Sequence, residues 1–207
     1  MRFANLVKQV DSYYSGKLRE YGVSPRGVDW NSRESQVIRF DQLLGVCDLT
    51  RPCSINDFGC GYGALLDELV ERGCAVDYCG YDISAAMIAQ ASRHHDGRDR
   101  CTFTADESVV PEADYTLASG IFNVRLETPE PLWEEYILAT LATIDRLSQR
   151  GFAFNMLTRY SDPERMRGDL YYGDPCAFFD HCKRLFSRQV ALLHNYGLYE
   201  FTIRVHK

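Results

Sequence analysis

Residues 54–63 read Ser-Ile-Asn-Asp-Phe-Gly-Cys-Gly-Tyr-Gly, and this stretch decides the fold class of the 207-residue chain. Its first half belongs to a short apolar run, residues 53–58, that predicts a strand. Apolar residues at helical spacing then predict a helix over residues 64–72, which Gly73 ends. A strand, a glycine-rich turn and a helix in this order are typical of nucleotide-cofactor sites. Glycines let the backbone approach a ligand, and the start of the helix directs free N–H groups at it.

The alternation of strand and helix continues along the chain. Strands are expected at residues 75–81, 101–104, 115–119 and 152–157, with intervening helices that begin after Ser84 and at Pro131. Residues 189–194 and 199–205 flank a turn and predict a hairpin. The predicted fold is therefore α/β: a doubly wound, mostly parallel seven-stranded sheet with helices on both faces and a C-terminal antiparallel hairpin strand.

The chain length suits a single domain, residues 1–207. Residues 1–20 read as a helix, and Ser32 is placed to cap a second helix with one apolar face. We expect residues 1–50 to form a helical lid over a Rossmann-like core of residues 51–207.

Composition excludes several classes of function. A net charge of −6 and a pI of about 5.4 disfavour nucleic acid as a partner, because an acidic surface repels phosphate backbones. None of the eight cysteines forms a C-x-x-C pair, and His94 and His95 are expected to be structural, so no metal site is predicted. No apolar run approaches the roughly 18 residues of a membrane span, and no signal segment precedes residue 17. We therefore expect a cytoplasmic protein without a membrane partner.

Two acids separate the possible cofactors. Asp57 ends the first strand directly before the turn, where a carboxylate would repel a pyrophosphate by roughly a kcal/mol or more. S-adenosylmethionine has no phosphate and carries a sulfonium and an α-ammonium, so the same acid attracts it. The glycines at 59, 61 and 63 also depart from the G-x-G-x-x-G spacing of dinucleotide sites. Asp82, 19 residues after Gly63, is placed to accept hydrogen bonds from ribose hydroxyls.

The segment 54–92 resembles the class I S-adenosylmethionine-dependent methyltransferases. The turn D-x-G-x-G-x-G and the continuation D-x-S-x-x-M-I, residues 82–88, match the first two motifs of that superfamily. The likeness is clear over residues 53–124 and less specific elsewhere. It implies S-adenosylmethionine as cofactor and S-adenosylhomocysteine as product.

The resemblance also implies roles for single positions. The methionine part of the cofactor is expected at Asp57, Gly59, Cys60, Gly61, Ser119 and Gly120. The ribose is expected at Asp82, and the adenine at Ile83, Ala105, Asp106 and Glu107. The N-terminal segment commonly covers the cofactor in this superfamily, so Arg39 becomes the candidate partner of the cofactor carboxylate, and Trp30 and Tyr14 become candidates to close the pocket.

The implied reaction is an in-line methyl transfer that depends mainly on alignment of the nucleophile with the breaking C–S bond. We expect a small-molecule acceptor with an oxygen or nitrogen nucleophile, since the chain has no large extra domain. The substrate-facing candidates are Phe122, Asn123, Asn155, Tyr171 and Tyr172; no general base is nominated, and the oligomeric state is not predicted. Two alternatives remain: a non-catalytic cofactor-binding sensor or partner subunit, and a nicotinamide-dependent oxidoreductase, against which Asp57 argues.

Overall fold

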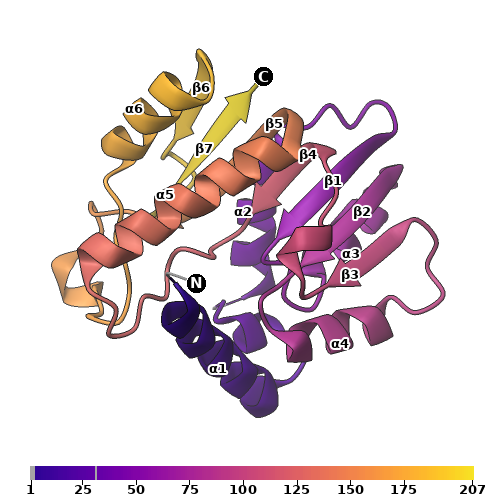
Figure 1. Cartoon of the computed structure of the whole chain (residues 1–207), viewed down its shortest axis with the longest axis horizontal. Coiled ribbons are helices and arrows are strands. Elements are labelled where there is room, and N and C mark those ends of the chain that lie inside the picture. Colours follow the sequence, from indigo (N-terminus) through magenta and orange to yellow (C-terminus); the bar gives the residue numbers. More distant parts are fainter. Residues whose placement is uncertain (1–2, 31) are drawn as a thin grey trace.

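A computed structural model describes residues 3–30 and 32–207. Seven strands form one sheet in the order β3-β2-β1-β4-β5-β7-β6 (Figure 1). The strands are β1 (Cys53–Phe58), β2 (Val76–Tyr81), β3 (Cys101–Thr104), β4 (Ala113–Ala118), β5 (Ser148–Leu157), β6 (Gln189–Leu193) and β7 (Glu200–His206). Neighbouring strands are parallel except where β7 pairs with β5 and with β6. The predicted fold class, including the antiparallel C-terminal hairpin, is confirmed.

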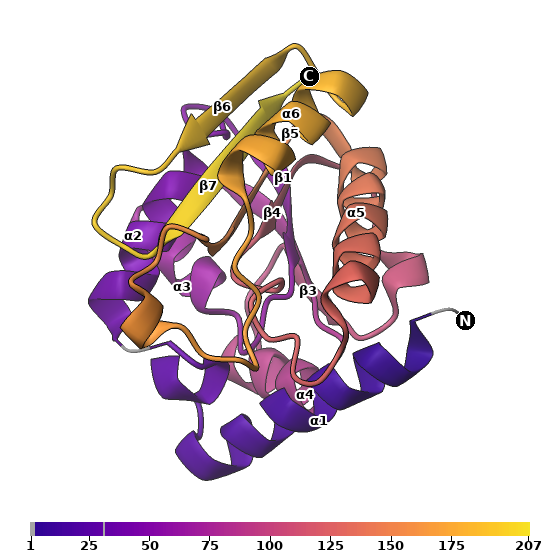
Figure 2. The ribbon, with the colours of Figure 1, turned by 90° about the vertical axis from the view of Figure 1, so that its left-hand side faces the viewer.

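Helices cover both faces of the sheet (Figure 2). The helices are α1 (Ala4–Tyr21), α2 (Arg33–Leu44), α3 (Ala64–Glu71), α4 (Ala85–His94), α5 (Glu130–Leu147) and α6 (Pro175–Leu185), with 3-10 turns η1 (Pro25–Val28), η2 (Glu107–Val109) and η3 (Pro163–Arg165). Two predicted caps are confirmed. The Ser32 hydroxyl accepts from the Ser35 N–H at 3.2 Å, and the Ser84 hydroxyl accepts from the Met87 N–H at 3.4 Å.

Each face of the sheet has its own apolar core. Helices α5 and α6 pack on one face, against side chains such as Phe152 and Phe154, and α2 and α3 pack on the other, against Ala153 and Ile55. Successive side chains of a strand point to opposite faces, so a strand covered on both sides must be apolar throughout. This requirement explains why Phe152, Ala153, Phe154 and Met156 of β5 are apolar and fully buried.

The N-terminal elements divide between a cover and the core. Helix α1 crosses the ends of the strands, as Figure 2 shows, and the hydroxyls of Ser15 and Ser84 lie 3.0 Å apart where it meets α4. Lys17 pairs with Asp29 at 2.9 Å and so holds α1 to the residue that ends η1. Helix α2 instead packs into the core, where Leu43 is fully buried. Helix α2 also contributes Gln36 and Phe40 to the pocket at the strand ends, and the division at residue 50 stays a prediction.

Candidate functional site

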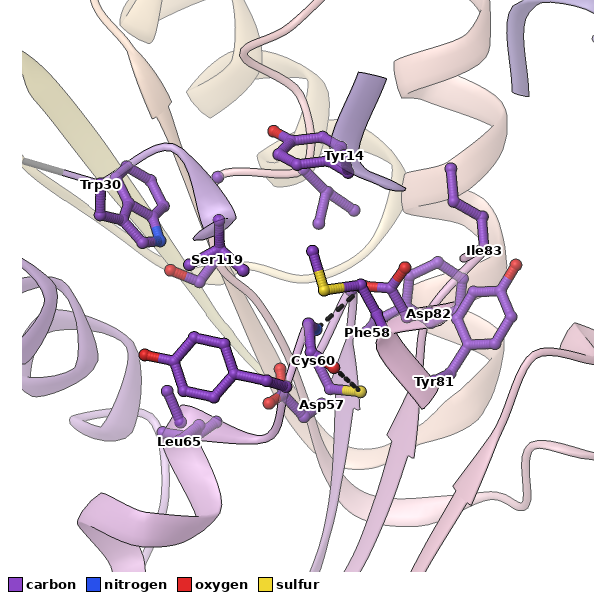
Figure 3. Close-up of a pocket in the computed structure, with 18 of the residues that line it drawn as sticks. Tyr14, Trp30, Asp57, Phe58, Cys60, Leu65, Tyr81, Asp82, Ile83 and Ser119 are labelled. Atoms are coloured by element: carbon purple, nitrogen blue, oxygen red, sulfur yellow. Dashed lines mark hydrogen bonds between the residues drawn. The ribbon is translucent and has the colours of Figure 1, made fainter. Parts of the chain in front are cut away.

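A pocket lies where the carboxyl ends of β1, β2 and β4 meet the N-terminal elements (Figure 3). It encloses about 850 Å³, part of it open to solvent. Ten of the residues expected at the cofactor line it: Tyr14, Trp30, Asp57, Gly59, Cys60, Gly61, Asp82, Ile83, Ser119 and Gly120. The structure therefore brings together residues from the lid, the glycine-rich turn and two further strand ends.

The glycine-rich turn is held close to its neighbours on two sides. The backbone N–H groups of Gly59 and Cys60 both donate to the carbonyl oxygen of Tyr81, at 2.7 and 2.9 Å, which ties the turn to the end of β2. Gly59 has a φ of +92°, and a Cβ there would lie 2.1 Å from a methyl carbon of Ile121. Both the backbone conformation and the close approach require glycine at this position.

Asp82 organises the turn and also faces the pocket. One carboxylate oxygen accepts from the Gly61 N–H at 2.9 Å, and the other accepts from the Ser84 N–H at 2.8 Å. Burial raises the pKa of Asp82 to about 6, although these two backbone donors act to lower it. A carboxylate has about four lone-pair sites, so two acceptor positions remain for a ligand.

Asp57 is a buried acid at the floor of the same pocket, 3% exposed. The Tyr78 hydroxyl donates to it at 2.6 Å. Burial raises the pKa of Asp57 to about 7; the bond from Tyr78 lowers it and the nearby carboxyl of Asp82 raises it further. A ligand cation in the pocket would favour ionisation of both acids.

The lining groups fit a cationic nucleoside without phosphates. The hydroxyl oxygen of Ser119 is buried, lines the pocket and has no hydrogen-bond partner, as expected of a group that awaits a ligand. Among residues 3–30 and 32–207, no lysine, arginine or histidine lines this pocket, whereas Asp57 and Asp82 do. A pyrophosphate would meet two acids and no side-chain cation here.

Arg39, expected at the cofactor carboxylate, is not among the residues that line the pocket. Its guanidinium donates to both carboxylate oxygens of Glu200 and is 3.9 Å from the centre of the Trp30 ring. Arg39 is 7% exposed and Glu200 is 1% exposed. This buried pair occupies the guanidinium in the structure, and a contact of Arg39 with the cofactor carboxylate stays a prediction.

The three residues expected at the adenine, Ala105, Asp106 and Glu107, are exposed and lie outside the lining. They follow β3, next to the end of β2. The Asp106 carboxylate accepts from the Ser108 N–H at 2.9 Å and so caps η2. Their contact with the adenine stays a prediction.

The five substrate-facing candidates lie outside this pocket and are packed within the fold. The carbonyl of Phe122 accepts from the Trp133 indole at 2.9 Å, and the side chain of Asn123 accepts from the Leu157 N–H at 3.0 Å. Asn155 is fully buried and bonds within the fold. The polar atoms of these three residues are therefore bonded within the fold, and their contact with an acceptor stays a prediction.

The tyrosine pair is also structural. The Tyr171 hydroxyl donates to Glu134 at 2.9 Å, and its ring packs edge-on against Phe178. The Tyr172 hydroxyl accepts from the Arg167 N–H at 2.9 Å. Neither residue lines the cofactor pocket, and stacking of the pair on an acceptor stays a prediction.

Several lining residues were not singled out in the sequence. These are Val10, Val28, Gln36, Phe40, Phe58, Tyr62, Ala64, Leu65, Tyr81, Met87, Ile121 and Tyr136. Two carried a usable signal: Tyr62 sits between two glycines of the turn, and Gln36 is a polar residue on the apolar face of α2. Tyr136 comes from the middle of α5, and nothing local distinguishes it from a core aromatic residue.

One cluster among the described residues has the composition of a metal site. Ligand atoms of Asp67, His94 and His95 lie within 4.8 Å of one another. The His94 imidazole lies 2.9 Å from the Asp67 carboxylate, and the His95 imidazole lies 3.2 Å from the carbonyl of Gly63. These hydrogen bonds account for the cluster by tying α4 to the start of α3, and the expected absence of a metal stays a prediction.

Comparison with known proteins agrees with this geometry. Residues 56–146 match the family model described as a methyltransferase domain. A protein of Mycobacterium tuberculosis, provisionally assigned as a methyltransferase, is 56% identical over 164 residues, which cover 79% of this chain and 99% of that protein.

Solved structures share the fold. A complex of DhpI with S-adenosylhomocysteine superposes with a TM-score of 0.63 at 17% identity, over 97% of this chain and 96% of that chain. Human N-acetylserotonin methyltransferase, solved with S-adenosylmethionine, gives a TM-score of 0.59 at 16% identity, over 84% of this chain and 53% of that chain.

The fold, the glycine-rich turn with its two acids, and the close relative define one class of protein. The chain belongs to the class I S-adenosylmethionine-dependent methyltransferase family. No helix within residues 3–30 and 32–207 has the length and apolarity to cross a membrane.

Proposed function

We propose that this methyltransferase binds S-adenosylmethionine in the pocket at the ends of β1, β2 and β4 and methylates a small-molecule acceptor. The observation that carries the proposal is the presence of two acids with raised pKa values, Asp57 and Asp82, in a lining that contains no side-chain cation among the described residues. The family membership and the cofactor complexes of the structural neighbours support the choice of cofactor.

The chain supplies orientation. The free acceptor positions of Asp82 would hold the ribose hydroxyls, with the side chain of Ile83 against the adenine. The unpartnered Ser119 hydroxyl would hold the methionine part, while Asp57 supplies negative charge below it. Tyr14 and Trp30 reach the pocket from the N-terminal segment and would exclude water from it.

S-adenosylmethionine supplies an activated methyl group whose leaving group departs as a neutral thioether. The protein therefore gains most by alignment of the acceptor with the C–S bond. We propose an acceptor with an oxygen or nitrogen nucleophile. DhpI matches this chain over nearly the full length of both chains and has been solved in one complex with S-adenosylmethionine and a further ligand, HEP. A chain of this extent therefore holds a second ligand together with the cofactor without an additional domain, which supports a small acceptor here.

A methyl-transfer screen tests the proposal. Purified protein is incubated with S-adenosylmethionine and a panel of phenols, amines and carboxylic acids, and formation of S-adenosylhomocysteine is measured. Turnover of at least one class is expected. Tight cofactor binding with no turnover across the panel would favour the cofactor-binding sensor or partner subunit instead. Binding of NAD with no binding of S-adenosylhomocysteine would favour the oxidoreductase.

A further inference from the structure

A buried ion pair joins the N-terminal segment to the last strand of the sheet. The Nε of Arg39, on α2, lies 2.9 and 2.8 Å from the two carboxylate oxygens of Glu200, and its Nη2 lies 2.5 Å from one of them. Glu200 is the first residue of β7. Removal of both charges from water is costly, and an apolar pair of similar size is often as stable. Stability alone therefore does not explain why a charged pair occupies this position.

The side chain of Asn155 connects the Arg39–Glu200 ion pair to the wall of the pocket. The Asn155 amide nitrogen lies 3.3 Å from a Glu200 oxygen, and the Asn155 amide oxygen accepts from the Gly120 N–H at 2.6 Å. A carboxylate only accepts and a backbone N–H only donates, so these two partners fix the orientation of the amide. Glu200 thereby determines where the Asn155 oxygen holds the backbone of Gly120.

Arg39, the other member of the ion pair, also contacts the pocket wall near Gly120, through Trp30. The Arg39 guanidinium lies over the face of Trp30, and a Cβ on Gly120 would come within 2.4 Å of that indole ring. Trp30 and Gly120 both line the pocket. The five residues Trp30, Arg39, Glu200, Asn155 and Gly120 therefore form a closed ring of contacts, which we call the Glu200 ring.

We propose that Glu200 and Asn155 are positioning residues, which hold Gly120 and Trp30 in the arrangement that binds the cofactor. The unpartnered hydroxyl of Ser119 directly precedes Gly120, and the Ile121 side chain meets Gly59 in the glycine-rich turn. A shift of this backbone therefore displaces two contact surfaces of the cofactor at once. The inference rests on the proposed function, because it assigns these residues a role in binding at the same pocket.

Two matched substitutions separate positioning from stability. Asn155 and Asn56 are buried asparagines, 0% and 1% exposed, on β5 and β1. The Asn56 amide donates to the Pro111 carbonyl at 2.7 Å and does not line the pocket. We expect Asn155→Ser to raise the Kd of S-adenosylhomocysteine at least tenfold and Asn56→Ser to change it less than twofold, although both lower the Tm. Equal Kd values for the two variants would overturn the inference.

A second variant avoids an orphaned buried charge. The double substitution Arg39→Met with Glu200→Leu removes both members of the pair and is expected to fold, with a far-ultraviolet circular dichroism spectrum like that of the wild type. Because Asn155 then loses its orienting partner, we expect a Kd for S-adenosylhomocysteine at least tenfold higher. A Kd within twofold of the wild-type value would contradict the inference.

A measurement on the protein without cofactor distinguishes failure of the positioning role from failure of the proposed function. Amide hydrogen exchange at Gly120 is measured by nuclear magnetic resonance in the unliganded protein. We expect it to be at least tenfold faster in Asn155→Ser than in the wild type, and unchanged in Asn56→Ser. If wild-type protein fails to bind S-adenosylhomocysteine, the proposed function fails. Unchanged Gly120 exchange in Asn155→Ser would instead refute the ring.

Discussion

Removal of the Asp82 carboxylate gives the sharpest test of how the pocket recognises its ligand. Asp82 already accepts from the backbone N–H groups of Gly61 and Ser84, and its free acceptor positions are assigned to the ribose. Hydrogen bonds to a charged group are worth about 1.5–3 kcal/mol. Asp82→Ala should therefore weaken the binding of S-adenosylhomocysteine roughly 10- to 150-fold. Asp82→Asn should lose less, because its amide oxygen can still accept one bond.

Isothermal titration calorimetry with S-adenosylhomocysteine measures this change directly. Asp77→Ala is the matched control: Asp77 lies on β2, the strand that Asp82 directly follows, is exposed, and pairs with Arg100 at 2.6 Å. Its removal should leave the Kd within about twofold of the wild-type value, since surface ion pairs contribute little. An Asp82→Ala protein that is folded and binds with wild-type affinity would refute the ribose assignment.

Four further outcomes are expected. Asp57, with a pKa of about 7, should ionise as the pH rises from 6 to 8. Because the ionised carboxylate attracts the cationic cofactor, calorimetry should show tighter binding of S-adenosylmethionine to the wild-type protein at the higher pH. In Asp57→Asn this pH dependence of the Kd should be smaller. Because the raised pKa penalises the charged carboxyl in the fold, Asp57→Asn should also raise the Tm of the unliganded protein at pH 8, and a lower Tm there would contradict the burial argument. Gly120→Ala should lower the Tm and weaken cofactor binding. A φ of +71° costs a residue with a side chain about 1–2 kcal/mol, and the added Cβ would clash with the Trp30 ring. A variant with the Tm and Kd of the wild type would contradict this geometry. Tyr171→Phe should lower the free energy of unfolding by about 1 kcal/mol, measured by urea denaturation, because the hydrogen bond to Glu134 is lost. The Kd of S-adenosylhomocysteine should not change, because this bond lies outside the pocket. A higher Kd would indicate that Tyr171 contributes to the cofactor site.

Local chemistry made most of the fold predictable. The bounds of β1 and β3 were predicted to the residue, because each is a short run of strand-forming residues between clear turn signals. The start of β5 was predicted four residues too late, at 152 instead of 148. Gly151 reads as a break, but α5 passes directly into the strand and the Ser148 hydroxyl donates to the Ile144 carbonyl at 2.6 Å. Only the packed helix–strand junction reveals that continuity.

The site was predictable where the turn itself builds it. Asp57 and Asp82 follow from their places at strand ends, and both line the pocket. The ion pair of Arg39 was not predicted, because its partner, Glu200, lies 161 residues further along the chain and no local pattern indicates that pairing. Asn155 was placed near a strand end, but its side-chain partners, Gly120 and Glu200, come from two distant parts of the chain. Residues that act through long-range contacts stay hidden from a single sequence.

The central claim is that the glycine-rich turn, together with the acids Asp57 and Asp82, selects a cationic nucleoside without phosphates. Calorimetric titration of the purified protein with S-adenosylmethionine, S-adenosylhomocysteine and NAD, at the same pH and salt concentration, tests it most directly. We predict micromolar or tighter binding of the first two ligands, weaker binding of S-adenosylhomocysteine in Asp82→Ala, and no measurable binding of NAD. Micromolar binding of NAD together with no binding of S-adenosylmethionine would contradict the claim.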